Sequence, residues 1–208
     1  MQVPVKMNEG RRITDANTLD IITMVYAGKI NKNIVAELQA NNCNSVGFSG
    51  ADGNTIIAEK RPVKEVDYGF VGNVVKVEVS VIKLLLINKL TISFCAISHN
   101  QKGQLLNTNA DTIASELAIA LSNDFEVELY YCFEKNGVLK DIEDDDSVIE
   151  QMNKSTYEQL KKEGVIYEGM IPKLDNCFYA LERGVQNIHI GKPSMLFKEG
   201  IKHTTIEK

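Results

Sequence analysis

The fold is decided around Leu105-Leu106-Asn107-Thr108-Asn109-Ala110-Asp111, which runs without a break into the segment 112–121. Apolar side chains recur there at every fourth position, at Ile113, Leu117 and Leu121. This period predicts an amphipathic helix, and Asn109 or Asp111 is the residue type that caps a helix N-terminus. The stretch therefore predicts a helix that begins among polar side chains.

Two interpretations of these polar side chains are open. In the first, one of them caps the helix and the others are solvated. In the second, the free backbone N–H groups and the positive end of the helix dipole belong to a site for an anionic substrate. Predicted strands at 90–96 and 127–133 flank the helix. Because βαβ units gather ligands at the carboxyl ends of their strands, this context favours the second interpretation.

The N-terminal part of the chain is predicted to begin with two helices. Thr14 or Asp15 can cap the first helix, and Gly28 is expected to end it. The second helix follows at once, with an apolar face formed by Ile30, Ile34 and Leu38. Strand-like segments lie at 45–49, 56–58, 74–79, 90–96, 127–133 and 186–190, the last being the expected final core strand. The alternation predicts an α/β fold with a mostly parallel sheet.

Two more helices are predicted in the C-terminal part. Ser155-Thr156-Tyr157-Glu158 has the spacing of a capping box, so a helix should begin there and end at Gly164. Pro172 suits the first turn of the next helix, which Gly184 should end. Its buried face is formed by Leu174, Phe178 and Leu181. Lys173 then lies where the helix dipole disfavours a cation, which a bound anion would explain, although exposed lysines also occur in first turns.

Composition limits the possible functions. The 208 residues are 44% hydrophobic and have a net charge of −5 without a basic cluster, so neither nucleic acid nor membrane is an expected partner. The four cysteines are widely spaced and are interpreted as reduced thiols of a cytoplasmic protein. Neither a signal peptide nor an apolar run of membrane-spanning length is present in the sequence.

Several familiar site patterns are missing from the sequence. It contains neither a P-loop, nor a dinucleotide-binding glycine motif, nor a serine-hydrolase elbow, nor a zincin motif. The acidic run Glu143-Asp144-Asp145-Asp146 could hold a cation but is interpreted as a solvated turn. The histidines lack metal-ligand spacing. We therefore predict no metal site on the protein.

Four segments occur in a distinctive order along the chain. They are Gly10-Arg11-Arg12-Ile13-Thr14-Asp15, Asp67-Tyr68-Gly69-Phe70-Val71-Gly72, Asn107-Thr108-Asn109-Ala110-Asp111 and Gly169-Met170-Ile171-Pro172-Lys173. Together they resemble the N-acetylglutamate kinases of the amino acid kinase family. The resemblance covers nearly the whole chain from about Asn8. It implies a three-layer αβα sandwich in one domain, 1–208, without a clean linker. The part at about 1–105 would bind the acyl amino acid and the part at about 106–208 would bind ATP. The resemblance also implies a homodimer.

The resemblance implies ATP-dependent phosphorylation of the side-chain carboxylate of an N-acylated glutamate, the second step of arginine biosynthesis. By this resemblance Arg12 and Asn107 bind the substrate, assisted by Asn109. Lys173 stabilises the transferring phosphoryl group, and Asp111 orients Lys173 by pairing with it. These roles fit phosphoryl transfer, in which positioning and charge stabilisation dominate and Mg²⁺ comes mainly with the ATP phosphates.

The sequence departs from the family pattern in two places. The family begins with a strand, a glycine-rich turn with a second catalytic lysine, and an H-G-G-G segment, and nothing before Asn8 matches them. We therefore expect an N-terminally truncated sequence, and weak or no kinase activity for these 208 residues alone. Acylglutamate-dependent ADP production by this chain would refute that expectation.

The second departure is Phe133-Glu134-Lys135-Asn136-Gly137, where relatives usually carry Thr or Ser and then Asp before the glycine. Glu134 and Gly137 are the expected nucleotide contacts. This variant segment is similar to kinases of the Bacteroides-like group, whose acyl group can be succinyl instead of acetyl, so both acyl groups stay open.

Two alternatives to this kinase are open. One is a noncatalytic acylglutamate-binding or regulatory subunit, or fragment of such a kinase, that keeps Arg12 and Asn107 but lacks the ATP half. The other is an amino acid kinase with another substrate, such as aspartate, which fits the segments around Arg12 and Asn107 less well.

Overall fold

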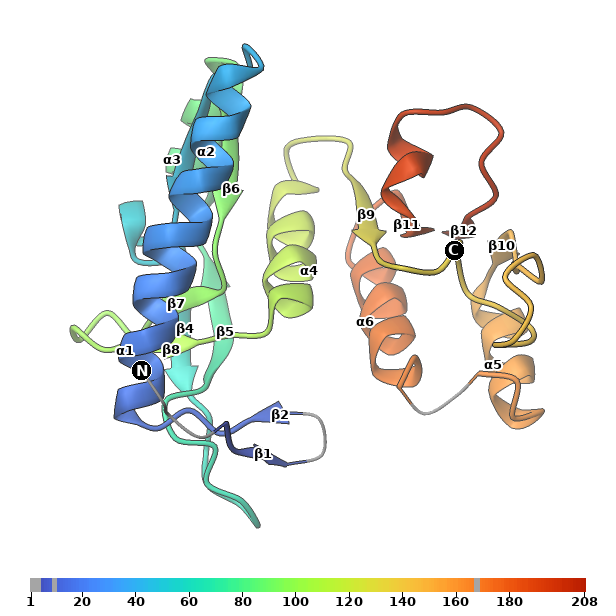
Figure 1. Ribbon diagram of the computed structural model, residues 1–208, viewed down its shortest axis with the longest axis horizontal. Coiled ribbons are helices and arrows are strands. Elements are labelled where there is room, and N and C mark those ends of the chain that lie inside the picture. Colours follow the sequence, from blue (N-terminus) through green and yellow to red (C-terminus); the bar gives the residue numbers. More distant parts are fainter. Residues whose placement is uncertain (1–4, 9–10, 167–168) are drawn as a thin grey trace. The chain divides into compact units, whose positions relative to one another are not determined.

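The computed structural model describes residues 5–8, 11–166 and 169–208 (Figure 1). The chain divides into two compact units, Met1–Ile113 and Ala114–Lys208, which we call unit 1 and unit 2. Helix α4, Ala110–Leu121, contains the boundary between them. Within the described residues, none of the helices has the length and apolar character needed to cross a membrane.

Unit 1 begins with the short hairpin β1, Met7–Asn8, and β2, Arg11–Arg12. A long helical segment follows as α1, the π-helix η1 and α2, with bounds Ala16–Ile22, Thr23–Ile30 and Asn31–Ala40. The side chain of Asp15 accepts a hydrogen bond from the backbone N–H of Thr18, which confirms Asp15 as the cap. Hydrogen bonding by Thr18, first through its side chain and then through its backbone N–H, holds the pKa of Asp15 below its usual value.

Two predictions about this helical segment are wrong. Gly28 lies inside η1, and its carbonyl accepts from the backbone N–H of Asn31, so helical hydrogen bonding continues through it. The expected apolar face of α2 is also incorrect, because Ile30 and Ile34 are 46% and 44% exposed. The buried position belongs to Asn31, whose Nδ2 donates to the carbonyl of Ser93 at 2.8 Å. Because this bond satisfies a polar side chain in the packed face, apolar periodicity misplaced the face.

Two sheets form the rest of unit 1. Strands β3, Ser45–Phe48, and β6, Thr91–Phe94, pair in parallel. The second sheet has the order β5-β4-β7-β8. Its strands are β4, Ile56–Lys60; β5, Gly72–Val77; β7, Ile97–His99; and β8, Leu105–Asn107. The β4/β7 pair is parallel, while β4/β5 and β7/β8 are antiparallel. The short 3-10 turn η2, Asp52–Asn54, and helix α3, Val79–Ile87, complete the unit.

Unit 2 contains one four-stranded sheet of order β10-β12-β11-β9. Its strands are β9, Glu128–Cys132; β10, Gln151–Met152; β11, Asn187–Gly191; and β12, Thr204–Ile206. The pairs β9/β11 and β10/β12 are parallel. The expectation that β11 is the final core strand is wrong. Strand β12 follows the short 3-10 helix η3, Pro193–Leu196, and its three residues are too few to show a strand period.

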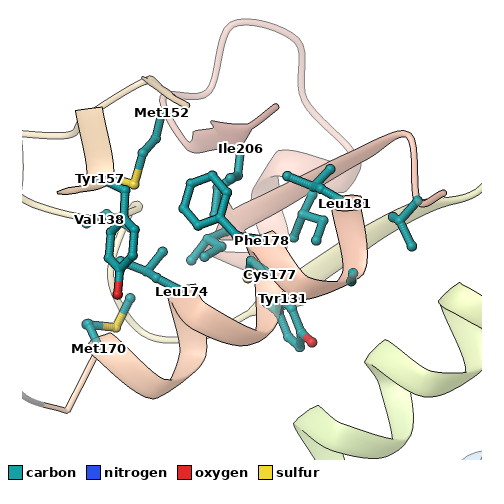
Figure 2. Close-up of a cluster of buried hydrophobic side chains, with 14 of the residues drawn as sticks. Tyr131, Val138, Met152, Tyr157, Met170, Leu174, Cys177, Phe178, Leu181 and Ile206 are labelled. Carbon is teal, nitrogen blue, oxygen red and sulfur yellow. The ribbon is translucent and has the colours of Figure 1, made fainter. Parts of the chain in front are cut away.

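Helices α5, Lys154–Lys162, and α6, Ile171–Glu182, belong to unit 2. The cap of α5 is Asn153, which accepts from the backbone N–H of Thr156, and not Ser155 as predicted. The predicted buried face of α6 is confirmed, since Leu174 and Leu181 are 0% and 1% exposed. Figure 2 shows these side chains packed together with others from the strands and α5. Helices and parallel strand pairs in both units confirm the α/β fold class.

Candidate active site

Thr14 is the point in unit 1 at which three of the four recognised segments meet. Its side chain is fully buried, and its Oγ1 accepts a hydrogen bond from Nδ2 of Asn107 at 3.0 Å. Its backbone N–H donates to the carbonyl of Tyr68 at 3.0 Å, and its carbonyl accepts from the N–H of Phe70 at 2.7 Å. Segments 10–15, 67–72 and 107–111 are therefore joined directly to one another.

Gly69 makes this junction possible. Its φ is +70°, and a Cβ at this position would lie 2.2 Å from the carbonyl oxygen of Thr14. The backbone N–H of Gly69 donates to the carboxylate of Asp67 at 2.8 Å, which holds the turn. Both the backbone conformation and the close approach of Thr14 require a glycine here.

A buried hydroxyl pair supports the loop that follows Asn107. Oγ of Ser98 and Oγ1 of Thr108 lie 2.6 Å apart, and both residues are almost fully buried. A Cβ on Gly72 would lie about 3.0 Å from both hydroxyl oxygens, so the glycine leaves room for the pair. Sequence reasoning missed this pair, since neither hydroxyl belongs to a local capping pattern.

Arg12 lies on β2, two residues before Thr14, and is partly buried. Residues two apart in an extended segment face the same side. If the extended backbone continues from β2 to Thr14, Arg12 is expected on the side of the chain from which Thr14 reaches Asn107. The binding of a substrate carboxylate by Arg12 stays a prediction.

At the start of α4 the structure distinguishes Asn109 from Asp111. The side chain of Asn109 accepts from the backbone N–H of Thr112 at 3.0 Å, so Asn109 caps the helix. Asp111 lies in the first turn and is partly buried. Thus the capping interpretation holds for Asn109, and substrate contact by it stays a prediction.

Lys173 lies in the first turn of α6, as predicted from Pro172. Its Nζ is 4.7 Å from the centroid of the Tyr131 ring. Tyr131 is 6% exposed, and its hydroxyl is 2.6 Å from Oγ of Ser115. Asp111 belongs to unit 1 and Lys173 to unit 2, so their pairing stays a prediction. Sequence reasoning assigned Tyr131 only to a strand and did not predict that its ring contacts the ammonium group of Lys173.

The expected nucleotide contacts lie in the loop after β9. Glu134 is exposed, whereas Gly137 is buried. A Cβ on Gly137 would lie 2.6 Å from Oγ1 of Thr204, which accepts from the N–H of Val138. The glycine is therefore needed for packing against β12, and contact with a nucleotide stays a prediction for both residues.

The acidic run after this loop is exposed, and the backbone N–H groups of Glu143 and Asp146 donate to the side chains of Asp141 and Asp144. Asp145 forms an ion pair with Lys135 at 2.7 Å, and their hydrogen bond lowers the pKa of Asp145 and raises that of Lys135. Across residues 5–8, 11–166 and 169–208, no group of three or more His, Cys, Asp or Glu side chains could hold a metal ion. The geometry agrees with a solvated turn.

Comparison with known proteins places the chain in a family. The sequence model of the amino acid kinase family matches residues 1–192. A protein named acetylglutamate kinase from Cytophaga hutchinsonii is 55% identical over 189 residues, which cover 90% of this chain and 72% of the relative. Another of that name from Bacteroides thetaiotaomicron is 55% identical over 185 residues, with 89% and 72% covered. The predicted resemblance to Bacteroides-like acetylglutamate kinases is confirmed.

A solved structure extends the similarity to the whole fold. The protein smu.665 from Streptococcus mutans UA159 aligns with a TM-score of 0.79 at 25% identity, covering 99% of this chain and 78% of that one. The family match, the identity to the relatives and the fold similarity agree with one another. The chain belongs to the amino acid kinase family.

Proposed function

We propose that this chain acts in transferring the γ-phosphoryl group of ATP to the side-chain carboxylate of an N-acylated L-glutamate, the second step of arginine biosynthesis. N-acetyl-L-glutamate is the acceptor we favour, and N-succinyl-L-glutamate is the other candidate. The junction at Thr14 is the observation that carries the proposal, because it joins the segment of Arg12 to Asn107. Relatives named acetylglutamate kinase at 55% identity support it.

In this proposal the residues of unit 1 bind the acyl amino acid. The guanidinium of Arg12 pairs with a substrate carboxylate, for which its planar fork is suited. Asn107 directs Nδ2 toward Thr14, so its Oδ1 is directed to the other side and can accept from the N–H of the acylated amine. Asn109 assists at the edge of this site.

The residues of unit 2, together with Asp111 of unit 1, act on the phosphates and the nucleotide. Lys173 stabilises the negative charge that develops on the transferring phosphoryl group, and Asp111 orients Lys173 by pairing with it. Glu134 and Gly137 contact the nucleotide. Mg²⁺ enters with the ATP phosphates, and we assign it no ligand on the protein.

Acylglutamate-dependent ADP release by the expressed protein, at its full natural length, tests the proposal. We expect release with N-acetyl- or N-succinyl-L-glutamate and not with L-aspartate. Lys173→Ala should lower kcat by about 100- to 1,000-fold, as expected for loss of one transition-state donor. Lys161→Ala, in the same unit and ion-paired with Asp175 at 3.6 Å, is the matched control and should leave kcat unchanged. Turnover of Lys173→Ala within a few-fold of the wild type would contradict the proposal.

Calorimetry separates this kinase from a noncatalytic acylglutamate-binding subunit. The kinase should bind both acylglutamate and ATP, whereas the subunit would bind acylglutamate alone. Arg12→Ala should weaken acylglutamate binding by about tenfold or more, since it removes a charged hydrogen-bonding partner. Unchanged affinity would remove Arg12 from the site.

We further propose that the protein is a cytoplasmic homodimer. The four cysteines all lie within the described residues and form no disulfide with one another, which fits a reducing compartment. The resemblance to the family supports the dimer. Sedimentation equilibrium tests it, because a monomer mass at assay concentration would contradict it.

A further inference from the structure

Tyr131 presents its ring to the ammonium group of Lys173. The distance from Nζ to the ring centroid is 4.7 Å, within the range of an attractive cation–π contact. Tyr131 comes from β9 and Lys173 from the first turn of α6, and both belong to unit 2. The ring is buried, which strengthens its attraction for a cation relative to an exposed ring.

The hydroxyl of Tyr131 is held at its far end by Ser115. The two oxygens lie 2.6 Å apart, and Ser115 is 3% exposed. In Figure 2 the Tyr131 hydroxyl points out of the apolar cluster toward α4. Because each buried hydroxyl satisfies the other, rotation of the ring away from this position would leave two polar groups unpaired.

The location of Lys173 at a helix N-terminus explains why contact with the Tyr131 ring matters. The first turn of α6 has no side-chain cap, and its dipole repels a cation. An aromatic face attracts the ammonium without adding a negative charge next to the phosphoryl group. We propose that Tyr131, held by Ser115, is a positioning residue that keeps Lys173 at the phosphoryl-transfer site. This inference rests on the proposed function.

A second tyrosine in unit 2 offers a matched control. Tyr157 is 2% exposed, and Nζ of Lys161 lies 5.1 Å from its ring centroid. Its hydroxyl donates to Asp175 at 2.6 Å. The pair Tyr157 and Lys161 therefore has the same type of ring contact, but it has no role in the proposed reaction.

The experiment compares Tyr131→Leu, Tyr131→Phe and Tyr157→Leu in the full-length protein. Tyr131→Leu should lower kcat by about tenfold, the scale of a partly desolvated cation–π contact, with KM for acylglutamate unchanged. Tyr131→Phe keeps the ring and should keep kcat within a few-fold. Tyr157→Leu should lower stability and leave kcat unchanged. A kcat for Tyr131→Leu equal to that of Tyr157→Leu overturns the inference.

A second measurement reads the contact without catalysis. In protein labelled with ¹³C at lysine Cε, the Lys173 resonance, assigned with Lys173→Arg, should be shifted upfield by the ring. This upfield shift should persist in Tyr131→Phe and vanish in Tyr131→Leu. If the leucine variant does not fold, Tyr131→Met replaces it, and the shift should vanish there too. If the wild type releases no ADP, the proposed function fails, while absence of this shift overturns the Tyr131 contact itself.

Discussion

The two units hold their predicted site residues by different means. In unit 1, hydrogen bonds tie three segments far apart in the sequence to the buried Thr14. In unit 2, Lys173 lies on helix α6, and Leu174, the residue that follows it, is fully buried. The arrangement in unit 1 therefore depends on a few polar contacts and one glycine. The position of the lysine depends instead on apolar packing.

Truncation of the α6 core should have the largest effect. Leu174→Ala should lower the free energy of unfolding by about 2–5 kcal/mol, because it leaves a cavity in a fully packed cluster. Urea denaturation measures this value. Leu196→Ala, at a position that is 46% exposed, is the control and should change stability little. Equal effects of the two substitutions would show that packing does not hold α6.

A methyl group at Gly69 should have the next largest effect. Gly69→Ala should cost about 2–4 kcal/mol, because it combines a positive φ with a clash against the carbonyl of Thr14. Gly164→Ala in unit 2 is matched in φ, at +72°, but nothing lies within 4 Å of the added Cβ. It should cost only about 1–2 kcal/mol. If denaturant unfolding gave both variants the same loss, the close approach at Thr14 would be unimportant.

Loss of the Asn107 amide should have a smaller effect on stability. Asn107→Ala should cost about 1–3 kcal/mol, since the fully buried hydroxyl of Thr14 loses its partner. Thr14→Val in the same protein should recover part of this loss, because no unpaired hydroxyl then remains. Asn123→Ala, which removes an exposed bond in unit 2, is the control. A double variant no more stable than Asn107→Ala would argue against the Thr14 junction.

The pH dependence of unit 2 should show the smallest effect. Burial lowers the pKa of His189, whose Nδ1 lies 3.1 Å from Oγ1 of Thr205. As the pH falls through the ordinary histidine pKa, the unfolded chain takes up a proton that the folded chain does not, so stability decreases. The decrease ends below the folded pKa. Thermal melts between pH 8 and about pH 5 should show a flatter profile for His189→Gln, and identical profiles would rule out this contribution.

Local rules predicted several helix ends correctly. Asp15 caps α1 and Asn109 caps α4, as expected for their residue types. Pro172 lies in the first turn of α6, which places Lys173 there too. The same rules failed at α5, where the capping-box spacing predicted Ser155 and the structure has Asn153, two residues earlier, as the cap.

The packing faces were harder to predict. Ile30 and Ile34 have helical spacing, yet they are exposed because Asn31 packs against β6 through a hydrogen bond to Ser93. Periodicity counts apolar side chains and does not see a polar residue whose partner lies in another element. For the same reason, Tyr131 was recognised as a strand residue but not as the neighbour of Lys173.

By itself, the sequence determined the α/β class, several helix ends and the placement of Lys173 in a first helical turn. These features depend on residues within about one turn of each other. Only the tertiary structure decided that Thr14 joins three segments, that Gly69 must lack a side chain and that Tyr131 lies below Lys173. The Thr14–Asn107 bond connects residues 93 positions apart, so it exists only once the packing of the unit has brought those segments together.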